Sequence, residues 1–123
     1  MGDEQSKTIP SAPAQAQTAA QNFFGNPVKL LQAVGDPIQW SVLRELASCP
    51  SRSVQELAAA LKHDPDLISK HLRVLRDAGG LTVVASPDGD GRKQYHAVPE
   101  MFRRTEPSGK AGIDYGVCVL RFA

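Results

Sequence analysis

The chain has 123 residues and a formal net charge of +1 at pH 7. This length suits a single domain, and the near-zero charge excludes nucleic-acid binding through bulk charge alone, so such binding would need local clusters of Lys and Arg. No apolar run approaches the roughly 20 residues of a membrane-spanning helix. The N-terminus also lacks the apolar core of a secretory signal, so we expect a cytoplasmic protein with reduced thiols and no membrane partner.

The chain divides into three parts by composition. Residues 1–21 are rich in Ser, Ala, Gln, Thr and Pro, and they contain too few apolar residues to form a core. We predict that they form a disordered N-terminal tail. Residues 22–99 carry the periodic apolar pattern of a folded domain, and residues 100–123 form a C-terminal extension.

Two helices are predicted at the start of the domain. Residues 27–34 have Asn26 as a plausible N-cap and Pro27 at the first helical position. Gly35 ends this helix, and an Asp-Pro pair at residues 36–37 begins the next one in the same way. Apolar residues then recur at helical spacing, namely Ile38, Val42, Leu43 and Leu46.

The next two predicted helices are separated by a tight turn. Ser53 and Glu56 form a capping-box pattern at the start of the first, and Asp64 caps the second, which begins at Pro65. Each helix has an apolar stripe on one side. In the second helix this stripe consists of Ile68, Leu72 and Leu75. Two helices joined in this way form a helix-turn-helix, whose second helix can enter the major groove of DNA.

The period of the pattern changes after this motif. Residues 81–85 and 94–98 flank a Pro/Asp/Gly turn and predict a β-hairpin. Residues 99–112 predict a short helix in part and otherwise a linker. Residues 113–122 alternate apolar side chains and predict one strand at a dimer interface, with its symmetry mate as a candidate partner. The fold class is therefore mainly α with a small β-hairpin wing, a winged helix-turn-helix with a strand-like C-terminal segment.

Polar and basic side chains lie on the second helix of the motif, away from its apolar stripe. Ser69, Lys70 and Arg73 would contact bases or phosphates if this helix enters DNA. The alternative is an ordinary solvated helix face, and the helix-turn-helix geometry favours DNA contact. His71 fits two interpretations equally well, a donor to phosphate or a packed histidine at the rim of the core.

Basic residues outside the motif have the same two kinds of interpretation. Arg92 and Lys93 lie beside the hairpin turn, where they would contact a phosphate backbone or would only add soluble charge. The DNA interpretation is favoured because the hairpin directly follows the helix-turn-helix. Arg103 and Arg104 would extend this basic surface or lie in a solvated linker, and we favour the linker.

Cys49 and Cys118 are the only cysteines. They would form a disulfide or persulfide-type bridge as a thiol switch, share a soft metal or arsenical, or pack as small apolar residues. Packing is favoured because a structural zinc site normally needs four ligands, and further ligands are not evident. No catalytic motif and no glycine-rich phosphate loop is present, so we predict that the chain is not an enzyme.

The motifs taken together resemble the ArsR/SmtB-type transcriptional regulators. Residues 31–46 look like the opening motif of that family. Residues 54–58 followed by 68–79 look like its helix-turn-helix signature, and residues 91–96 look like its second wing strand. The resemblance covers about residues 28–99, with several separated motifs in the family's order.

The resemblance implies a homodimer whose two recognition helices bind a palindromic operator in double-stranded DNA. It also implies that the first helix and the C-terminal segment build the dimer interface, and that repression is relieved by a metal ion or a redox signal. We therefore predict a dimeric, sequence-specific DNA-binding repressor. The alternative is a winged-helix protein-interaction module without specific DNA binding, suggested by the near-neutral charge and by Asp64 and Asp66.

Three positions depart from the pattern of that family. The family often has Arg where this chain has Gln39, and its metal sensors often carry Cys-x-Cys in the third helix, which here contains no cysteine. The C-terminal segment has Asp114 but no His. No metal-binding residue is therefore predicted beyond the cysteine pair, and an inducer, if one exists, would be a metal ion or a thiol-reactive compound.

Overall fold

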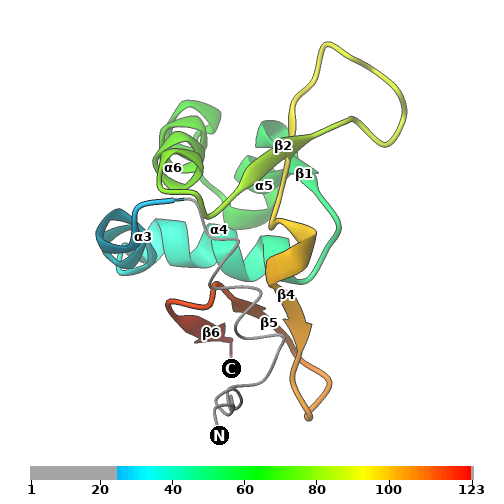
Figure 1. Cartoon of the computed structure of the whole chain (residues 1–123). Coiled ribbons are helices and arrows are strands. Elements are labelled where there is room, and N and C mark those ends of the chain that lie inside the picture. The colour runs from blue at the N-terminus through cyan, green and yellow to red at the C-terminus, as the bar shows by residue number, and fades with distance from the viewer. Residues whose placement is uncertain (1–24, 123) are drawn as a thin grey trace, which may run out of the picture.

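A computed structural model of the whole chain describes residues 25–122, so the predicted tail over residues 1–21 lies outside the described residues. Four helices form the upper part of the molecule as drawn in Figure 1, and two small sheets flank them. The helices are α3 (Pro27–Val34), α4 (Pro37–Ala47), α5 (Val54–Leu61) and α6 (Pro65–Asp77). None of these described helices is long and apolar enough to cross a membrane.

The helices begin where their capping residues predict. Asn26 and Asp36 accept hydrogen bonds from backbone N–H groups in the first turns of α3 and α4. Ser53 and Glu56 make both bonds of the capping box, at 3.2 and 3.0 Å. Asp64 accepts from the backbone of the first turn of α6 at 2.8 Å. These local bonds satisfy N–H groups that a helix start leaves without partners.

The turn between α5 and α6 depends on a left-handed residue that the sequence pattern did not indicate. Lys62 has φ 60° and ψ 46° and ends α5. The following N–H, of His63, donates to the carbonyl of Ala58 at 3.0 Å. This geometry reverses the chain within a few residues, and α6 then begins directly at Pro65. The predicted helix-turn-helix is thereby confirmed.

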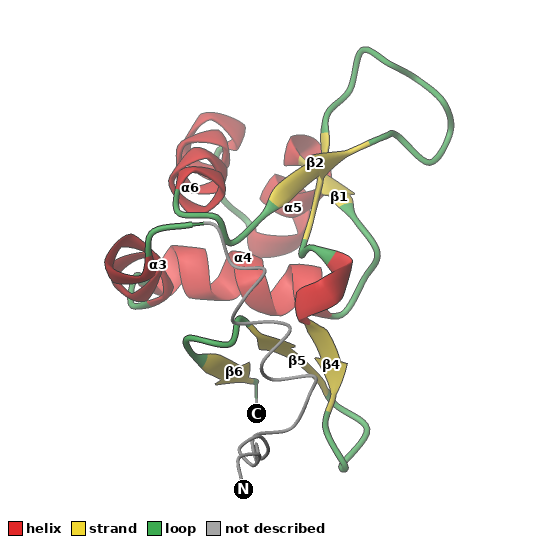
Figure 2. Ribbon diagram, in the orientation of Figure 1, coloured by secondary structure: helices red, strands yellow, loops and turns green. Residues whose placement is uncertain are grey.

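The predicted hairpin forms the wing. Strands β2 (Thr82–Val84) and β3 (Tyr95–Ala97) pair antiparallel, with Val83 opposite His96. A third strand, β1 (Arg52–Ser53), pairs with the other edge of β3, so the order is β1-β3-β2. Two residues are too short for a periodic pattern, which is why β1 was not predicted. The long loop between β2 and β3 extends away from the body (Figure 2).

A second sheet occupies the C-terminal part of the chain. After a 3-10 helix η1 (Glu100–Phe102), strands β4 (Arg103–Thr105), β5 (Ala111–Asp114) and β6 (Val119–Arg121) pair antiparallel in the order β4-β5-β6. The predicted short helix is confirmed by η1, but the predicted linker after it is wrong. That stretch forms the β4–β5 hairpin, closed by a bond from the Glu106 N–H to the Lys110 carbonyl at 2.7 Å.

The prediction of one strand over residues 113–122 is wrong in its extent. The chain turns at Gly116, where φ is 84°, and returns as β6. Ile113 and Tyr115 are fully buried, whereas Val117 and Val119 beyond the turn are each 43% exposed. Both edges of β5 are paired with strands of its own chain, so β5 has no free edge for a symmetry mate.

The helices and the C-terminal sheet share one apolar core. Gly80 lies at a tightly packed point of this core, because a Cβ atom there would be 3.1 Å from both the Leu30 Cδ1 and the Tyr115 hydroxyl oxygen. That hydroxyl donates to the Gly80 carbonyl at 2.8 Å. At another point Trp40 on α4 packs on Phe122, with ring centroids 4.8 Å apart. Aromatic pairs at such distances add to the stability from burial.

Candidate nucleic-acid interface

A groove runs between the start of α6, the start of α5 and the base of the wing. Its volume is about 620 Å³, and it is lined by Val54, Gln55, Pro65, Asp66, Ser69, Gly91, Arg92, Lys93 and Gln94. The groove brings one predicted residue of the recognition helix together with two predicted residues of the wing. A helix and a neighbouring wing that face the same groove form a surface able to contact DNA at two places.

The outward face of α6 presents basic side chains. Ile68, Leu72 and Leu75 are buried and hold α6 against the core, as their spacing predicted. Lys70 and Arg73 lie on the exposed side of the helix. Neither is ion-paired with another residue of the described chain, so their charges remain available to an external anion.

The charge of Arg92 is largely balanced within the wing. Its side chain is 91% exposed, but its Nε lies 3.1 Å from Asp90 Oδ1 and its Nη2 donates to Asp90 Oδ2 at 3.3 Å. The Arg92 side chain is also the main reason why the pKa of Asp90 lies below its usual range. Lys93 is exposed and makes no ion pair within residues 25–122. A phosphate would thus meet Lys93 directly, whereas it would compete with Asp90 for Arg92.

Carboxylates also lie at the start of the recognition helix. Asp64 and Asp66 are both exposed, and Asp66 lines the groove. The Asp64 carboxylate is used as the N-cap of α6. Both charges repel phosphate, so they favour a docking pose in which the backbone of the ligand passes nearer to Lys70 and Arg73.

His71 is bound to a residue that the sequence analysis did not assign to the site. Its Nδ1 lies 2.8 Å from Gln39 Oε1 and 3.8 Å from Asp36 Oδ1. Gln39 is only 5% exposed, and its Nε2 donates to the Ala33 carbonyl at 2.7 Å. Of the two interpretations of His71, this contact supports the packed histidine. Residues 32 positions apart give no local signal of such a contact.

A second histidine joins the recognition helix to the wing. His96 on β3 is 1% exposed, and its Nε2 lies 3.2 Å from Nη1 of Arg76 in the last turn of α6. Burial, and secondly the positive charge of Arg76, lower the pKa of His96 below its usual value. The ring is therefore held neutral, accepting from Arg76 through Nε2. Its Nδ1 has no hydrogen-bond partner within the described chain.

The two arginines of β4 have structural contacts. Arg103 donates to the carbonyls of Cys49 at 2.7 Å and Pro50 at 3.0 Å, beyond the end of α4. Arg104 Nε lies 2.9 Å from a carboxylate oxygen of Glu106. The prediction of a solvated linker is wrong for both residues. Strand β4 also lies on the opposite side of α4 from α6 (Figure 1), so these charges do not extend the surface of the recognition helix.

The two cysteines are free thiols with different surroundings, and both are half-buried. The Cys49 thiol donates to the Glu45 carbonyl at 3.2 Å and accepts from the Arg52 Nε at 3.4 Å. Burial, and secondly the Asp114 carboxylate, raise the pKa of Cys118, which disfavours the reactive thiolate. Within residues 25–122 no three His, Cys, Asp or Glu side chains are grouped so that they could hold a metal ion.

A family model described as the MarR family matches residues 36–93 of the chain. The transcriptional regulator HlyU from Vibrio vulnificus CMCP6 is 26% identical, and the match covers 69% of this chain and 80% of that chain with a TM-score of 0.50. NolR from Sinorhizobium fredii is 18% identical over 76% of this chain and 83% of that chain, with a TM-score of 0.52. Apo-NmtR, known from a solution structure, is 30% identical over 79% and 72% of the two chains, with a TM-score of 0.47.

No curated protein matches the chain. The family match spans α4, the helix-turn-helix, β2 and the wing loop as far as Lys93, and it includes every residue that lines the groove except Gln94. The matches confirm the winged helix-turn-helix fold. They also confirm that the chain belongs to a class of regulators rather than of enzymes.

Proposed function

We propose that this chain, which belongs with the winged-helix transcriptional regulators and has the sequence features of their ArsR/SmtB type, represses transcription as a homodimer on a palindromic DNA operator. The observation that carries the proposal is the pairing of exposed Lys70 and Arg73 on α6 with the groove shared by α6 and the wing. A helix in this position can enter the major groove while the wing follows the backbone.

The side chains divide into two expected roles on DNA. Lys70 and Arg73 would contact phosphates or guanine edges, and Ser69 would donate to a base or phosphate in the groove. Lys93 on the wing would contact the backbone. His71 has a lesser direct role than these, because its Nδ1 is already bound to Gln39.

A palindromic operator requires two copies of the chain, and the surface offers apolar area for pairing. On α3, Val28 is 63% and Leu31 is 52% exposed, and Val117 and Val119 are each 43% exposed. The Tyr115 hydroxyl, from the start of the β5–β6 turn, donates to the Gly80 carbonyl, and a Cβ atom at Gly80 would be 3.1 Å from both this hydroxyl and Leu30 of α3. We therefore propose α3 and the β5–β6 turn as the dimer interface, consistent with the two-fold symmetry of most homodimers.

The test is binding of the chain to the DNA upstream of its own gene, measured by fluorescence anisotropy at several salt concentrations. Replacing Lys70 and Arg73 together by Ala should weaken binding by roughly 10- to 100-fold and reduce the salt slope by about two per protomer, or about four for the dimer. The matched control is Lys110→Ala, an exposed lysine in the β4–β5 turn, which should leave both quantities unchanged. Absence of binding, or binding insensitive to the double substitution, would refute the proposal.

A second candidate function is a winged-helix module that binds another protein. The specific observation in its favour is that Asp90 balances Arg92 while Asp66 lines the groove. This function predicts no salt-dependent binding to any DNA. Tight operator binding that falls with salt would remove it.

A further inference from the structure

We propose that Gln39 is a positioning residue for the recognition helix and that it acts through His71. This inference rests on the proposed DNA-binding function of α6. Gln39 is buried in the first turn of α4 and makes one hydrogen bond to α3 and one to α6. The side chain therefore joins the end of the first helix to the middle of the recognition helix.

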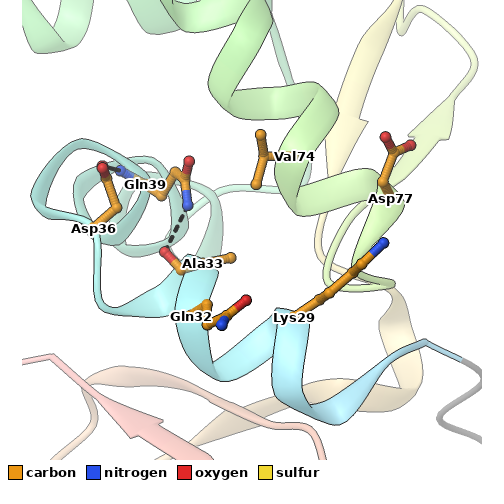
Figure 3. A pocket seen from close by; sticks show the side chains of 7 residues that line it. All are labelled: Lys29, Gln32, Ala33, Asp36, Gln39, Val74 and Asp77. Atoms are coloured by element: carbon orange, nitrogen blue, oxygen red, sulfur yellow. Dashed lines mark hydrogen bonds between the residues drawn. The ribbon is translucent and has the colours of Figure 1, made fainter.

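The orientation of the Gln39 amide follows from its first bond. The Ala33 carbonyl can only accept, so the group 2.7 Å from it must be the NH₂ of Gln39, as Figure 3 shows by the dashed line. The amide oxygen then faces Nδ1 of His71 at 2.8 Å. Each end of the amide thus has one partner: the NH₂ group donates to α3 and the oxygen accepts from α6.

This orientation dictates which ring nitrogen of His71 donates to Gln39. An amide oxygen accepts, so Nδ1 of His71 must carry the proton that it donates. In the neutral ring the other nitrogen, Nε2, then has no hydrogen. In this tautomer Nε2 cannot donate to a DNA phosphate, so we infer that His71 contributes to binding through the contact with Gln39.

The location of the link explains how it would control DNA binding. His71 lies directly after Lys70 and two residues before Arg73 on α6, so a movement of this part of the helix moves both cations. The link also forms one side of a pocket of about 450 Å³ between α3 and α6, lined by Lys29, Gln32, Ala33, Asp36, Gln39, Val74 and Asp77 (Figure 3). On this side of α6 the Asp36 carboxylate also approaches His71 Nδ1, at 3.8 Å, and the open space of the pocket lies beside both contacts.

The first test measures the link without DNA. Nitrogen-15 NMR of the imidazole should show His71 in the Nδ1–H tautomer in the wild-type chain and in Gln32→Met, a control on the exposed wall of the same pocket. Gln39→Met, which keeps the shape of the side chain but removes both bonds, should lose this preference. A wild-type His71 in the Nε2–H tautomer would overturn the proposal.

The second test compares two amides at position 71 in operator binding. Asn places its NH₂ near the position of Nδ1, and Gln reaches the position of Nε2. We expect His71→Asn to stay within about threefold of wild type and His71→Gln to lose about tenfold, the loss of roughly one hydrogen bond. The reverse order would indicate a direct phosphate contact and would overturn the proposal.

The variants also separate this proposal from the proposed function. Gln39→Met should lose about tenfold in operator affinity while Gln32→Met loses nothing, and unchanged affinity in folded Gln39→Met would overturn the positioning role. If Gln39→Met does not fold, the half-buried position 71 supplies the decisive pair of variants. If the wild-type chain binds no DNA, the function fails as a whole, and a wild-type Nδ1–H tautomer would support only the link.

Discussion

The two ends of this molecule use positive charge in opposite ways. At the recognition helix, Lys70 and Arg73 are exposed and unpaired within the described chain. In the C-terminal sheet, Arg104 and Arg121 both lie against Glu106, and Arg103 is bound to backbone carbonyls beyond α4. The net charge of +1 therefore conceals a division between cations that stabilise the fold and cations available to a ligand.

This division predicts which measurement each substitution should change. Removing a structural cation should lower the free energy of unfolding and leave the DNA affinity of the folded molecules intact. Removing an available cation should weaken DNA binding and leave the free energy of unfolding nearly unchanged, because a solvated charge contributes little to stability. A substitution that changed both would contradict the division.

The largest effect on stability is expected at Arg103. Arg103→Met keeps much of the side-chain volume but removes the bonds to the Cys49 and Pro50 carbonyls. Charge-assisted hydrogen bonds of this kind contribute about 1.5–3 kcal/mol, so we expect a loss of about 2 kcal/mol in urea unfolding. Lys110→Met is the exposed control. If Arg103→Met lost no more unfolding free energy than Lys110→Met, Arg103 would not be a structural cation.

The next effect is expected at Glu106, whose side chain is 12% exposed and lies 2.9 Å from Arg104 and 3.3 Å from Arg121. Glu106→Gln leaves two arginines without this carboxylate, and we expect a loss of about 1 kcal/mol, between the values for buried and exposed pairs. Glu100→Gln is the matched control, because Glu100 is 94% exposed in its pair with Arg103. Equal losses in the two variants would show that the Glu106 network has no special weight.

A smaller effect concerns pH and Arg76, a cation of α6 that contacts His96 of the wing. His96 beside Arg76 has a pKa lowered by burial in the folded chain, so it binds its proton more weakly when folded than when unfolded. Its contribution to stability is present above the unfolded-state pKa of about 6.5 and is lost as the pH falls below that value. When urea unfolding is measured between about pH 8 and 5, the free energy of unfolding should fall less for His96→Gln than for wild type as the pH is lowered. The same pH dependence of the free energy of unfolding in both proteins would show that His96 does not cause the loss.

The smallest effect should come from freeing Arg92 from its ion pair with Asp90, so that its charge becomes available to a ligand. Asp90→Asn removes the partner of Arg92, and we expect DNA affinity to rise by about two- to threefold, a typical value for one surface charge. Asp88→Asn removes the same charge from the same loop without a direct contact to Arg92, and it is the control. Equal increases in the two variants would mean that only the net charge of the wing matters.

The helix-turn-helix was predictable because its signals are local. Ser53 and Glu56 cap α5 from within the same turn, and the apolar spacing of α6 alone identifies its buried side. The exposure of Lys70 and Arg73 follows from that spacing. Each of these inferences needed only residues a few positions apart.

The C-terminal sheet and the Gln39–His71 contact depend on residues that are distant in sequence or on short strands. β4 has three residues, too few to show alternation, although the sequence Glu-Pro-Ser-Gly-Lys at 106–110 carries turn signals that indicate a hairpin. Gln39 and His71 are 32 positions apart, and neither has a neighbour that indicates the other. Tertiary packing alone brings them together.

Gly80 gives the fold a single point at which the first helix, the recognition helix and the C-terminal sheet can be disturbed together. An added methyl group would press on Leu30 and Tyr115 and also approach the Leu75 carbonyl at 3.4 Å. Overpacking of this kind typically costs about 1–3 kcal/mol, which is enough to shift the unfolding temperature of a domain of this size by several degrees. Gly80→Ala is therefore the natural choice for a temperature-sensitive allele, active in cool cultures and lost in warm ones without any change to the surface that faces the ligand.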